Sequence, residues 1–97
     1  MTYRIIVSPR AQNEIEDAIE YYKQYSSLAP KTFIAQLDTI YDTLSRNPYF
    51  HVCYKNVRII NILKFPYSIY FVINEDVKIV KILACFHHKL HPKRRPK

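Results

Sequence analysis

The spacing of hydrophobic residues predicts a strand and then a helix at the start of the chain. Residues 2–7 show the alternation of a short β-strand. From Ser8-Pro9 onward the hydrophobic residues recur every three or four positions, which predicts a helix with Ser8 as its N-cap and Pro9 in its first turn. The hydrophobic stripe of this helix comprises Ala11, Ile15, Ala18, Ile19, Tyr22 and Tyr25.

A second helical pattern follows an interruption at residues 25–30. Its hydrophobic face comprises Phe33, Leu37, Ile40, Tyr41 and Leu44, and the exposed positions include Gln36, Asp38, Asp42 and Ser45. Asn47-Pro48 ends the helix, because the residue before a proline is disfavoured in helical geometry. Two helices of similar length with a short connection predict an antiparallel helical hairpin.

The second half of the chain reads as strands, because its residues are mostly aliphatic and aromatic. In order, we expect a linker at 49–56 with a short edge strand near 52–54, two strands within 57–73 joined at Phe65-Pro66, a turn at 74–76 and a last strand at 77–86. The order β-α-α-β-β-β predicts an α+β domain with the helical hairpin packed on one face of a mainly antiparallel sheet. The last strands are hydrophobic on both faces, so we expect a partner on the open face.

Length and composition predict one globular domain over residues 1–97, since 97 residues with 48% hydrophobic content suffice for one modest core. The net charge of +7 is concentrated in residues 49–97, which hold ten of the 15 Lys/Arg and two of the eight Asp/Glu. Such a half is either a solvated basic face or a surface for nucleic acid or an acidic protein. Residues 89–97 read as a basic, flexible tail, extended by Pro92 and Pro96.

The absence of glycine excludes several enzyme classes. GxGxxG dinucleotide loops, P-loops and GxSxG nucleophile elbows all need the backbone freedom of glycine. The two cysteines lack metal or redox spacing and read as reduced thiols. The longest uncharged segment, 65–74, is too short for a membrane span and no signal peptide is recognisable, so we expect a cytoplasmic protein without membrane contact.

Several segments, taken in order and spacing, resemble the RelE/ParE superfamily of bacterial toxins from type II toxin–antitoxin modules. They are Ser8-Pro9-Arg10-Ala11, Leu44 through Asn47-Pro48, Tyr54-Lys55-Asn56-Val57-Arg58, Phe65-Pro66-Tyr67-Ser68-Ile69-Tyr70-Phe71, and His87 followed by Pro92. The Phe65-Pro66-Tyr67 element is closer to the ParE branch than to the RelE branch. The resemblance implies the fold predicted above and a compact, growth-inhibiting toxin that a cognate antitoxin neutralises.

The two branches imply different activities. ParE-like toxins inhibit DNA gyrase without an established hydrolytic site, and this is the function we expect. RelE-like toxins cleave mRNA on the ribosome, which is the alternative and would make the protein an endoribonuclease. A third possibility is an inactive member that only binds its antitoxin. Whether the chain is an enzyme stays open at this stage, and no cofactor or small-molecule ligand is expected.

A metal-free ribonuclease must stabilise charge on a phosphate and move protons to and from its oxygens. Arg58 is the candidate for the phosphate, since it matches an arginine of RelE-like nucleases, and His87 or His88 for proton transfer. The match is partial, because Lys89 stands where several of these nucleases carry tyrosine and Leu90 replaces the arginine of the ParE-like His-x-x-Arg-x-Pro pattern. Structural roles also stay open: Arg58 pairing with a carboxylate, and His87 packing at the strand end.

Cations are the candidates for binding a target or nucleic acid. They are Lys55, Arg58, Lys64, Lys81, Lys89, Lys93, Arg94 and Arg95. Tyr54 or Tyr70, if they lie on the open face, would stack on bases or pack against an antitoxin. His87-His88-x-x-His91 does not predict a metal site, because no helix presents these residues and no nearby carboxylate completes the ligand set.

Overall fold

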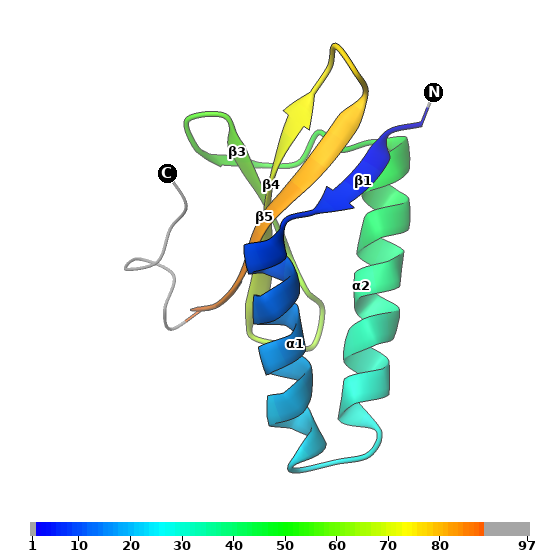
Figure 1. Cartoon of the computed structure of the whole chain (residues 1–97), viewed down its shortest axis with the longest axis vertical. Coiled ribbons are helices and arrows are strands. Elements are labelled where there is room, and N and C mark those ends of the chain that lie inside the picture. Colours follow the sequence, from blue (N-terminus) through cyan, green and yellow to red (C-terminus); the bar gives the residue numbers. More distant parts are fainter. Residues whose placement is uncertain (1, 89–97) are drawn as a thin grey trace.

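The computed structural model describes residues 2–88, which form two helices and one five-stranded sheet (Figure 1). In chain order the elements are β1 (Arg4–Val7), α1 (Pro9–Lys23), α2 (Ala29–Arg46), β2 (Val52–Tyr54), β3 (Val57–Asn61), β4 (Tyr67–Asn74) and β5 (Ile79–His87). The predicted α+β architecture is confirmed, and the short edge strand near 52–54 is β2. The predicted flexible tail lies outside the described residues.

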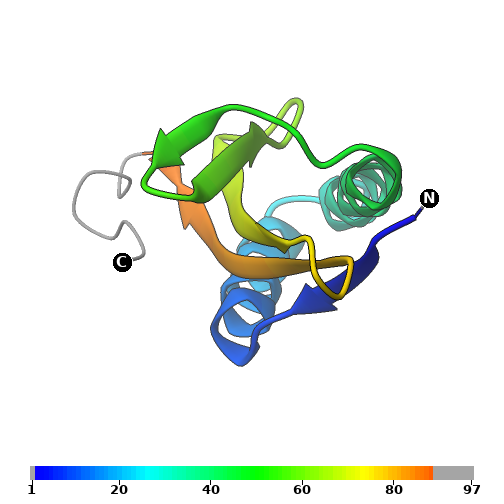
Figure 2. The same ribbon diagram turned by 90° about the horizontal axis from the view of Figure 1, so that it is seen from above.

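The sheet is mixed, with the spatial order β1-β5-β4-β3-β2. β2, β3, β4 and β5 are antiparallel neighbours because short turns connect them. β1 runs parallel to β5, since the helical hairpin carries the chain away from the sheet before it returns. Seen from above, the sheet is strongly curved and the two helices lie on one side of it (Figure 2).

The start of α1 is tied to β5 by side chains. Ser8 caps the helix by accepting the N–H of Ala11 at 3.1 Å, and its hydroxyl donates to the Leu83 carbonyl at 3.1 Å. One turn later, Glu14 accepts the backbone N–H of Cys85 at 2.9 Å. β1 pairs only with the first half of β5, so Ser8 and Glu14 satisfy backbone groups that β1 no longer reaches.

Helix and strand ends differ from prediction in two places. α1 ends at Lys23, so Tyr25 lies beyond the helix and is 70% exposed, not part of the buried stripe. The last strand begins at Ile79 because Lys78 adopts a positive φ of 54° that a strand cannot continue. The end of α2 at Arg46, before Asn47-Pro48, is as predicted. Neither described helix is long and apolar enough to cross a membrane.

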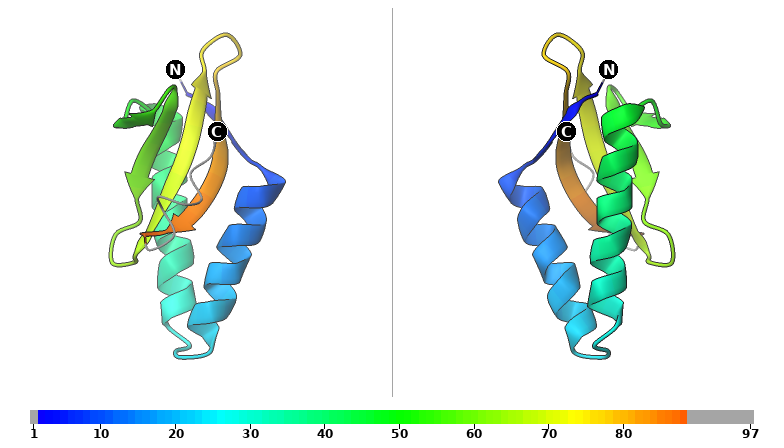
Figure 3. Two further views of the ribbon diagram at one scale, coloured as in Figure 1. Left: turned by 90° about the vertical axis from the view of Figure 1, so that its left-hand side faces the viewer. Right: turned by 90° about the vertical axis from the view of Figure 1, so that its right-hand side faces the viewer.

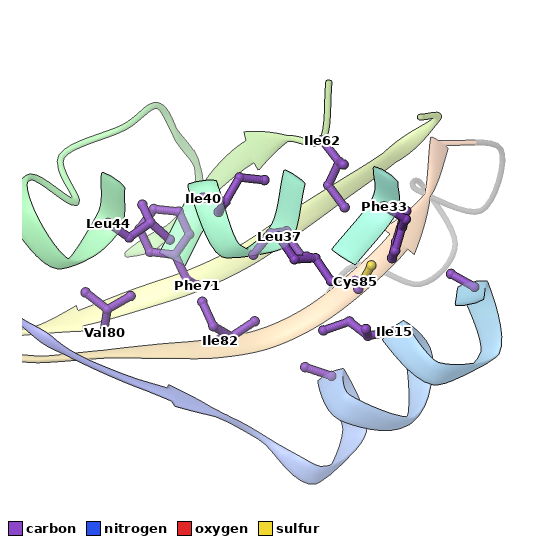
Figure 4. Close-up of a cluster of buried hydrophobic side chains, with 13 residues drawn as sticks. Ile15, Phe33, Leu37, Ile40, Leu44, Ile62, Phe71, Val80, Ile82 and Cys85 are labelled. Carbon is purple, nitrogen blue, oxygen red and sulfur yellow. The ribbon is translucent and has the colours of Figure 1, made fainter. Parts of the chain in front are cut away.

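The main core fills the space between the helices and the sheet. The helical hairpin stands against one face of the sheet, and its two helices spread apart toward the strands (Figure 3). Buried side chains from both helices meet those of β4 and β5 there: Ile15, Phe33, Leu37, Ile40, Leu44, Ile62, Phe71, Val80, Ile82 and Cys85 (Figure 4). A bulge at Leu83 lets Ile82 and Cys85, three residues apart, face the same core.

The other face of the sheet carries a smaller core of its own. Val57, Tyr70, Ala84 and Phe86 are buried there, and β2 and β3 contribute partly buried neighbours such as Tyr54. Tyr70 has no exposed surface and lies 5.3 Å from the Phe86 ring. It therefore cannot stack on bases, whereas Tyr54 keeps part of its surface accessible.

Three lysines occupy the left-handed region that usually favours glycine. Lys55, Lys64 and Lys78, with φ of 50°, 73° and 54°, lie in the turns that join β2 to β5. A side chain with a Cβ costs about 1 kcal/mol in this region relative to glycine. The absence of glycine from the chain therefore leaves strain in every hairpin turn of the sheet.

Replacing two of these lysines by glycine is expected to stabilise the protein. The double variant Lys55→Gly/Lys64→Gly should raise the free energy of unfolding by about 1 kcal/mol, after the entropy cost of two glycines in the unfolded chain. Urea denaturation would measure the gain. The matched control is Lys55→Ala/Lys64→Ala, which removes the same charges but keeps both Cβ atoms. Equal stability of the two double variants would contradict a strain at these turns.

Candidate functional site

Arg58 lies on the helix side of the sheet. Its cross-strand partner is Phe71, which belongs to the main core, and paired residues share a face. The guanidinium Nη1 donates to the Phe50 carbonyl at 2.8 Å, and the Arg58 Cζ lies 5.2 Å from the centre of the Tyr49 ring. Arg58 thus fastens β3 to the segment that follows α2.

A surface network extends from this arginine to the β4–β5 turn. The Tyr49 and Tyr3 hydroxyls are 3.1 Å apart, and Tyr3 donates to Glu75 at 3.0 Å. Lys78 pairs with the same carboxylate at 2.9 Å and, together with the Tyr3 hydroxyl, holds the pKa of Glu75 below its ordinary value. The surroundings of Arg58 are therefore those of a structural joint between three segments of the chain.

His87 faces α1 and a small acidic pocket. Its ring packs edge-on against Tyr67, with centroids 5.1 Å apart. The pocket has a volume of about 230 Å³, and its lining includes Glu14 and Asp17 of α1 beside Tyr21. Two carboxylates repel a phosphate, so this environment does not suit a histidine that must act on an RNA backbone.

His88 lies on the opposite face of the sheet from Arg58. Its Nε2 is 2.9 Å from the hydroxyl of buried Ser68, which donates to Asn61 Oδ1 at 2.6 Å. The Ser68 proton is used in that bond, so His88 must donate from Nε2. The His88 backbone N–H also donates to the Pro66 carbonyl at 2.8 Å, and the ring is held in one orientation.

Ser68 and Asn61 were not singled out from the sequence. They are direct cross-strand partners on either side of the Phe65-Pro66 junction. Their polar character inside two hydrophobic strands was the available signal. Recognising it required the hairpin register, which also explains why both side chains point to one face.

The three candidate catalytic residues do not come together. Arg58 is opposite Phe71, and His87 is opposite Tyr67, which precedes Phe71 by four residues in β4, a separation of roughly 13 Å along the strand. β4 also lies between their two strands. His88 is on the other face, so no single phosphate can contact Arg58 and either histidine in this arrangement.

The candidate lysines are spread over the described surface. Lys55 is in the β2–β3 turn with its Nζ 5.5 Å from the centre of the Tyr54 ring, and Lys64 is in the β3–β4 turn at the other end of the sheet (Figure 1). Lys81 of β5 lines an apolar groove of about 330 Å³ with Ile6, Val72, Asn74 and Ile79. Lys89, Lys93, Arg94 and Arg95 lie outside the described residues.

Acidic residues are absent from all five described strands. They lie on the two helices and in the β4–β5 turn. The open face of the sheet is therefore apolar with basic side chains, including Arg10, whose guanidinium Cζ lies 4.8 Å from the centre of the Phe86 ring. Such a surface suits a partner that is apolar and acidic. Within residues 2–88, no three His, Cys, Asp or Glu side chains are grouped to hold a metal ion.

Comparisons with known proteins agree with this architecture. No curated protein matches the chain in sequence. Among solved structures, the fold is similar to the toxin–antitoxin complex RelBE2 from Mycobacterium tuberculosis, with a TM-score of 0.67, 16% identity, and coverage of 90% of this chain and 99% of that one. For the chromosomal ParDE toxin–antitoxin system from P. aeruginosa, the TM-score is 0.68 with 13% identity, and coverage is 89% and 96%.

A mutant of the E. coli toxin RelE in the free state is similar as well. Its TM-score is 0.66 with 12% identity, and coverage is 95% of this chain and 90% of that one. The sequence model described as the ParE toxin of the type II toxin–antitoxin system parDE matches residues 5–91. That match spans most of the chain, including both helices, β2 to β5 and all of β1 except Arg4. The protein therefore belongs to the ParE toxin family of type II toxin–antitoxin systems.

Proposed function

We propose that this toxin acts by binding DNA gyrase, and that a cognate antitoxin neutralises it. The observation that carries the proposal is the position of Arg58. Its guanidinium is held by the Phe50 carbonyl and the Tyr49 ring on the helix side of the sheet, away from both histidines. Within the described residues, the predicted phosphate-binding and proton-transferring groups do not converge, which supports a toxin that acts by binding, as the resemblance to ParE implies.

The nuclease alternative has one observation in its favour. His88 is accessible, and Ser68 holds its ring with Nε2 as the donor. A positioned donor is one part of a ribonuclease site, but the phosphate-binding cation and a general base must lie within reach of the same substrate. Arg58, the predicted phosphate-binding cation, lies on the other face of the sheet from His88, so this function ranks second.

An antitoxin partner is supported by the neighbours and by the open face. The RelBE2 and ParDE structures are toxin–antitoxin systems. The open face combines the groove between Ile6 and Lys81 with basic side chains and has no acidic residue in its strands. An acidic antitoxin with an apolar stripe would complement this surface in charge and hydrophobicity.

The proposal is tested by adding the purified protein to DNA gyrase in a supercoiling assay. Supercoiling is expected to stop at saturating toxin and to resume when the protein encoded by the neighbouring reading frame is added. In cells, growth should arrest with a DNA-damage response, and mapped mRNA 5′ ends should match those of uninduced cells.

Three outcomes would overturn this function. Full supercoiling at saturating toxin would remove gyrase as the target. New mRNA ends that disappear in both the Arg58→Ala and His88→Ala variants would assign the nuclease activity instead. Unimpaired growth of cells that express the chain without an antitoxin would identify an inactive member of the family.

A further inference from the structure

The connected end of the helical hairpin projects beyond the sheet. We call residues 19–34 the hairpin tip; they include the last turn of α1, the connection and the first turns of α2 (Figure 3). The hairpin is anchored to the β3–β4 turn by Tyr22 and Phe33, whose rings lie 5.1 Å from that of Phe65. Beyond these two residues the tip has no strand behind it.

The tip carries large apolar side chains that folding leaves exposed. Tyr25 is 70% exposed and Leu28 is 68% exposed. No large apolar side chain of the described residues has a larger exposed fraction than Tyr25. Tyr21 and Ile34 are also exposed, at 51% and 44%. Several exposed apolar residues within one short segment of a small domain indicate an interaction surface.

A groove of about 590 Å³ runs between the two helices at this tip. Ile19, Pro30 and Ile34 provide its apolar lining. Ser26 and Ser27, in the connection between the two helices, line the groove as well. Lys23 and Lys31 provide the charged part of the lining, and no acidic residue contributes to it. The groove therefore combines an apolar floor with two ammonium groups.

The charge at this groove is only weakly compensated within the described residues. Lys31 has no salt bridge there, and Lys23 pairs with Glu20 at 3.1 Å, a contact in which both side chains are well exposed. α2 adds to the positive potential, since its N-cap Leu28 has no side-chain cap and its first turn has no acidic residue. A carboxylate placed beside an apolar side chain complements the groove.

We propose that the tip groove binds an acidic protein segment of the toxin's target, which inserts an apolar side chain between Ile19 and Ile34 and pairs a carboxylate with Lys31. This inference rests on the proposed function, in which the target is gyrase. A nucleic acid backbone would pair with the lysines but would leave Ile19 and Ile34 uncovered. A protein segment covers both kinds of surface, as interfaces with an apolar centre and a polar rim do.

The tip lies apart from the open face, where the antitoxin is proposed to bind. The groove between Ile6 and Lys81 belongs to β1, β4 and β5, whereas the tip groove is formed only by the two helices and their connection. The two binding events can therefore be measured separately on the same variants.

The test compares Lys31→Glu and Ile34→Ser, two changes in the groove lining, with the wild-type toxin in the supercoiling assay. Each variant should raise the concentration for half-inhibition about tenfold, because one loses the ion pair and the other an apolar contact. Lys31→Arg keeps the charge and should stay near wild-type potency. The control Arg4→Glu makes the same charge change on β1, at the far end of the molecule, and should stay within about twofold.

Lys31, Ile34 and Arg4 are all exposed, so the melting temperature should change little and report that each variant is folded. If wild-type toxin inhibits gyrase and Lys31→Glu and Ile34→Ser inhibit it equally well, the tip inference is wrong while the proposed function stands. If these variants instead lose affinity for the antitoxin, the groove belongs to the antitoxin and the inference is also wrong. A wild-type protein that does not inhibit gyrase would contradict both the proposed function and the tip inference.

Discussion

Raising the pH from about 9 to 12 is expected to destabilise the protein steeply, chiefly through Cys85. Burial in the main core, and then the nearby Glu14 carboxylate, raise the pKa of its thiol from 9.0 to about 12. Between these values the unfolded chain releases the proton while the native state keeps it, so unfolding becomes more favourable as the pH rises. The full contribution is present below pH 9, and up to roughly 4 kcal/mol is lost by pH 12.

Two tyrosines also lower the stability of the protein as the pH rises. Burial raises the pKa of Tyr41 and of Tyr67 from 10.0 to about 12, so their unfolded forms also ionise first above pH 10. Urea denaturation at a series of pH values would measure the loss. Cys85→Ala is the informative variant, because it keeps both tyrosines and should show a shallower decline between pH 9 and 10. An identical decline in this variant would contradict the assignment to Cys85.

Phe33→Ala is expected to lower the free energy of unfolding by about 3–5 kcal/mol, a large share of the stability of a domain of this size. Phe33 has no exposed surface, and its ring contacts those of Tyr22, Phe65 and Tyr67 at centroid distances of 5.9, 5.1 and 5.7 Å. The substitution removes the ring at the centre of this cluster and leaves a cavity where α2 meets the β3–β4 turn.

The neighbouring residue provides the control for this prediction. Ile34 is 44% exposed, so Ile34→Ala removes a partly hydrated side chain and should cost less than about 1 kcal/mol. Thermal and urea denaturation of both variants would measure the difference. A loss of similar size in the two variants would mean that the aromatic cluster does not anchor the hairpin as its geometry indicates.

Local sequence patterns predicted most of the architecture. Ser8-Pro9 begins α1 and Asn47-Pro48 follows α2, because capping and proline geometry depend on a few neighbouring residues. The same patterns failed where a long-range contact decides. Tyr25 has the helical spacing of the buried stripe, yet α1 ends before it and no strand lies behind that end of the hairpin.

The candidate site depended more strongly on tertiary structure. Arg58 was singled out from its strand, but the register with Phe71 decides that it faces the helices and the Phe50 carbonyl. His87 and His88 are adjacent in sequence and lie on opposite faces, one beside the carboxylates of α1 and the other bonded to Ser68. Spacing alone cannot show which face a residue occupies when both faces of a strand are hydrophobic.

The sequence by itself determined the family, the α+β class, the helical hairpin and the concentration of positive charge in the second half. The family follows from the order and spacing of short motifs, and the other three depend on composition and on short-range periodicity. Only the tertiary structure decided the partners of Arg58, the Asn61–Ser68–His88 hydrogen bonds and the exposed groove at the hairpin tip. Each of these depends on how the strands pair or how the two helices pack, which local sequence patterns do not specify.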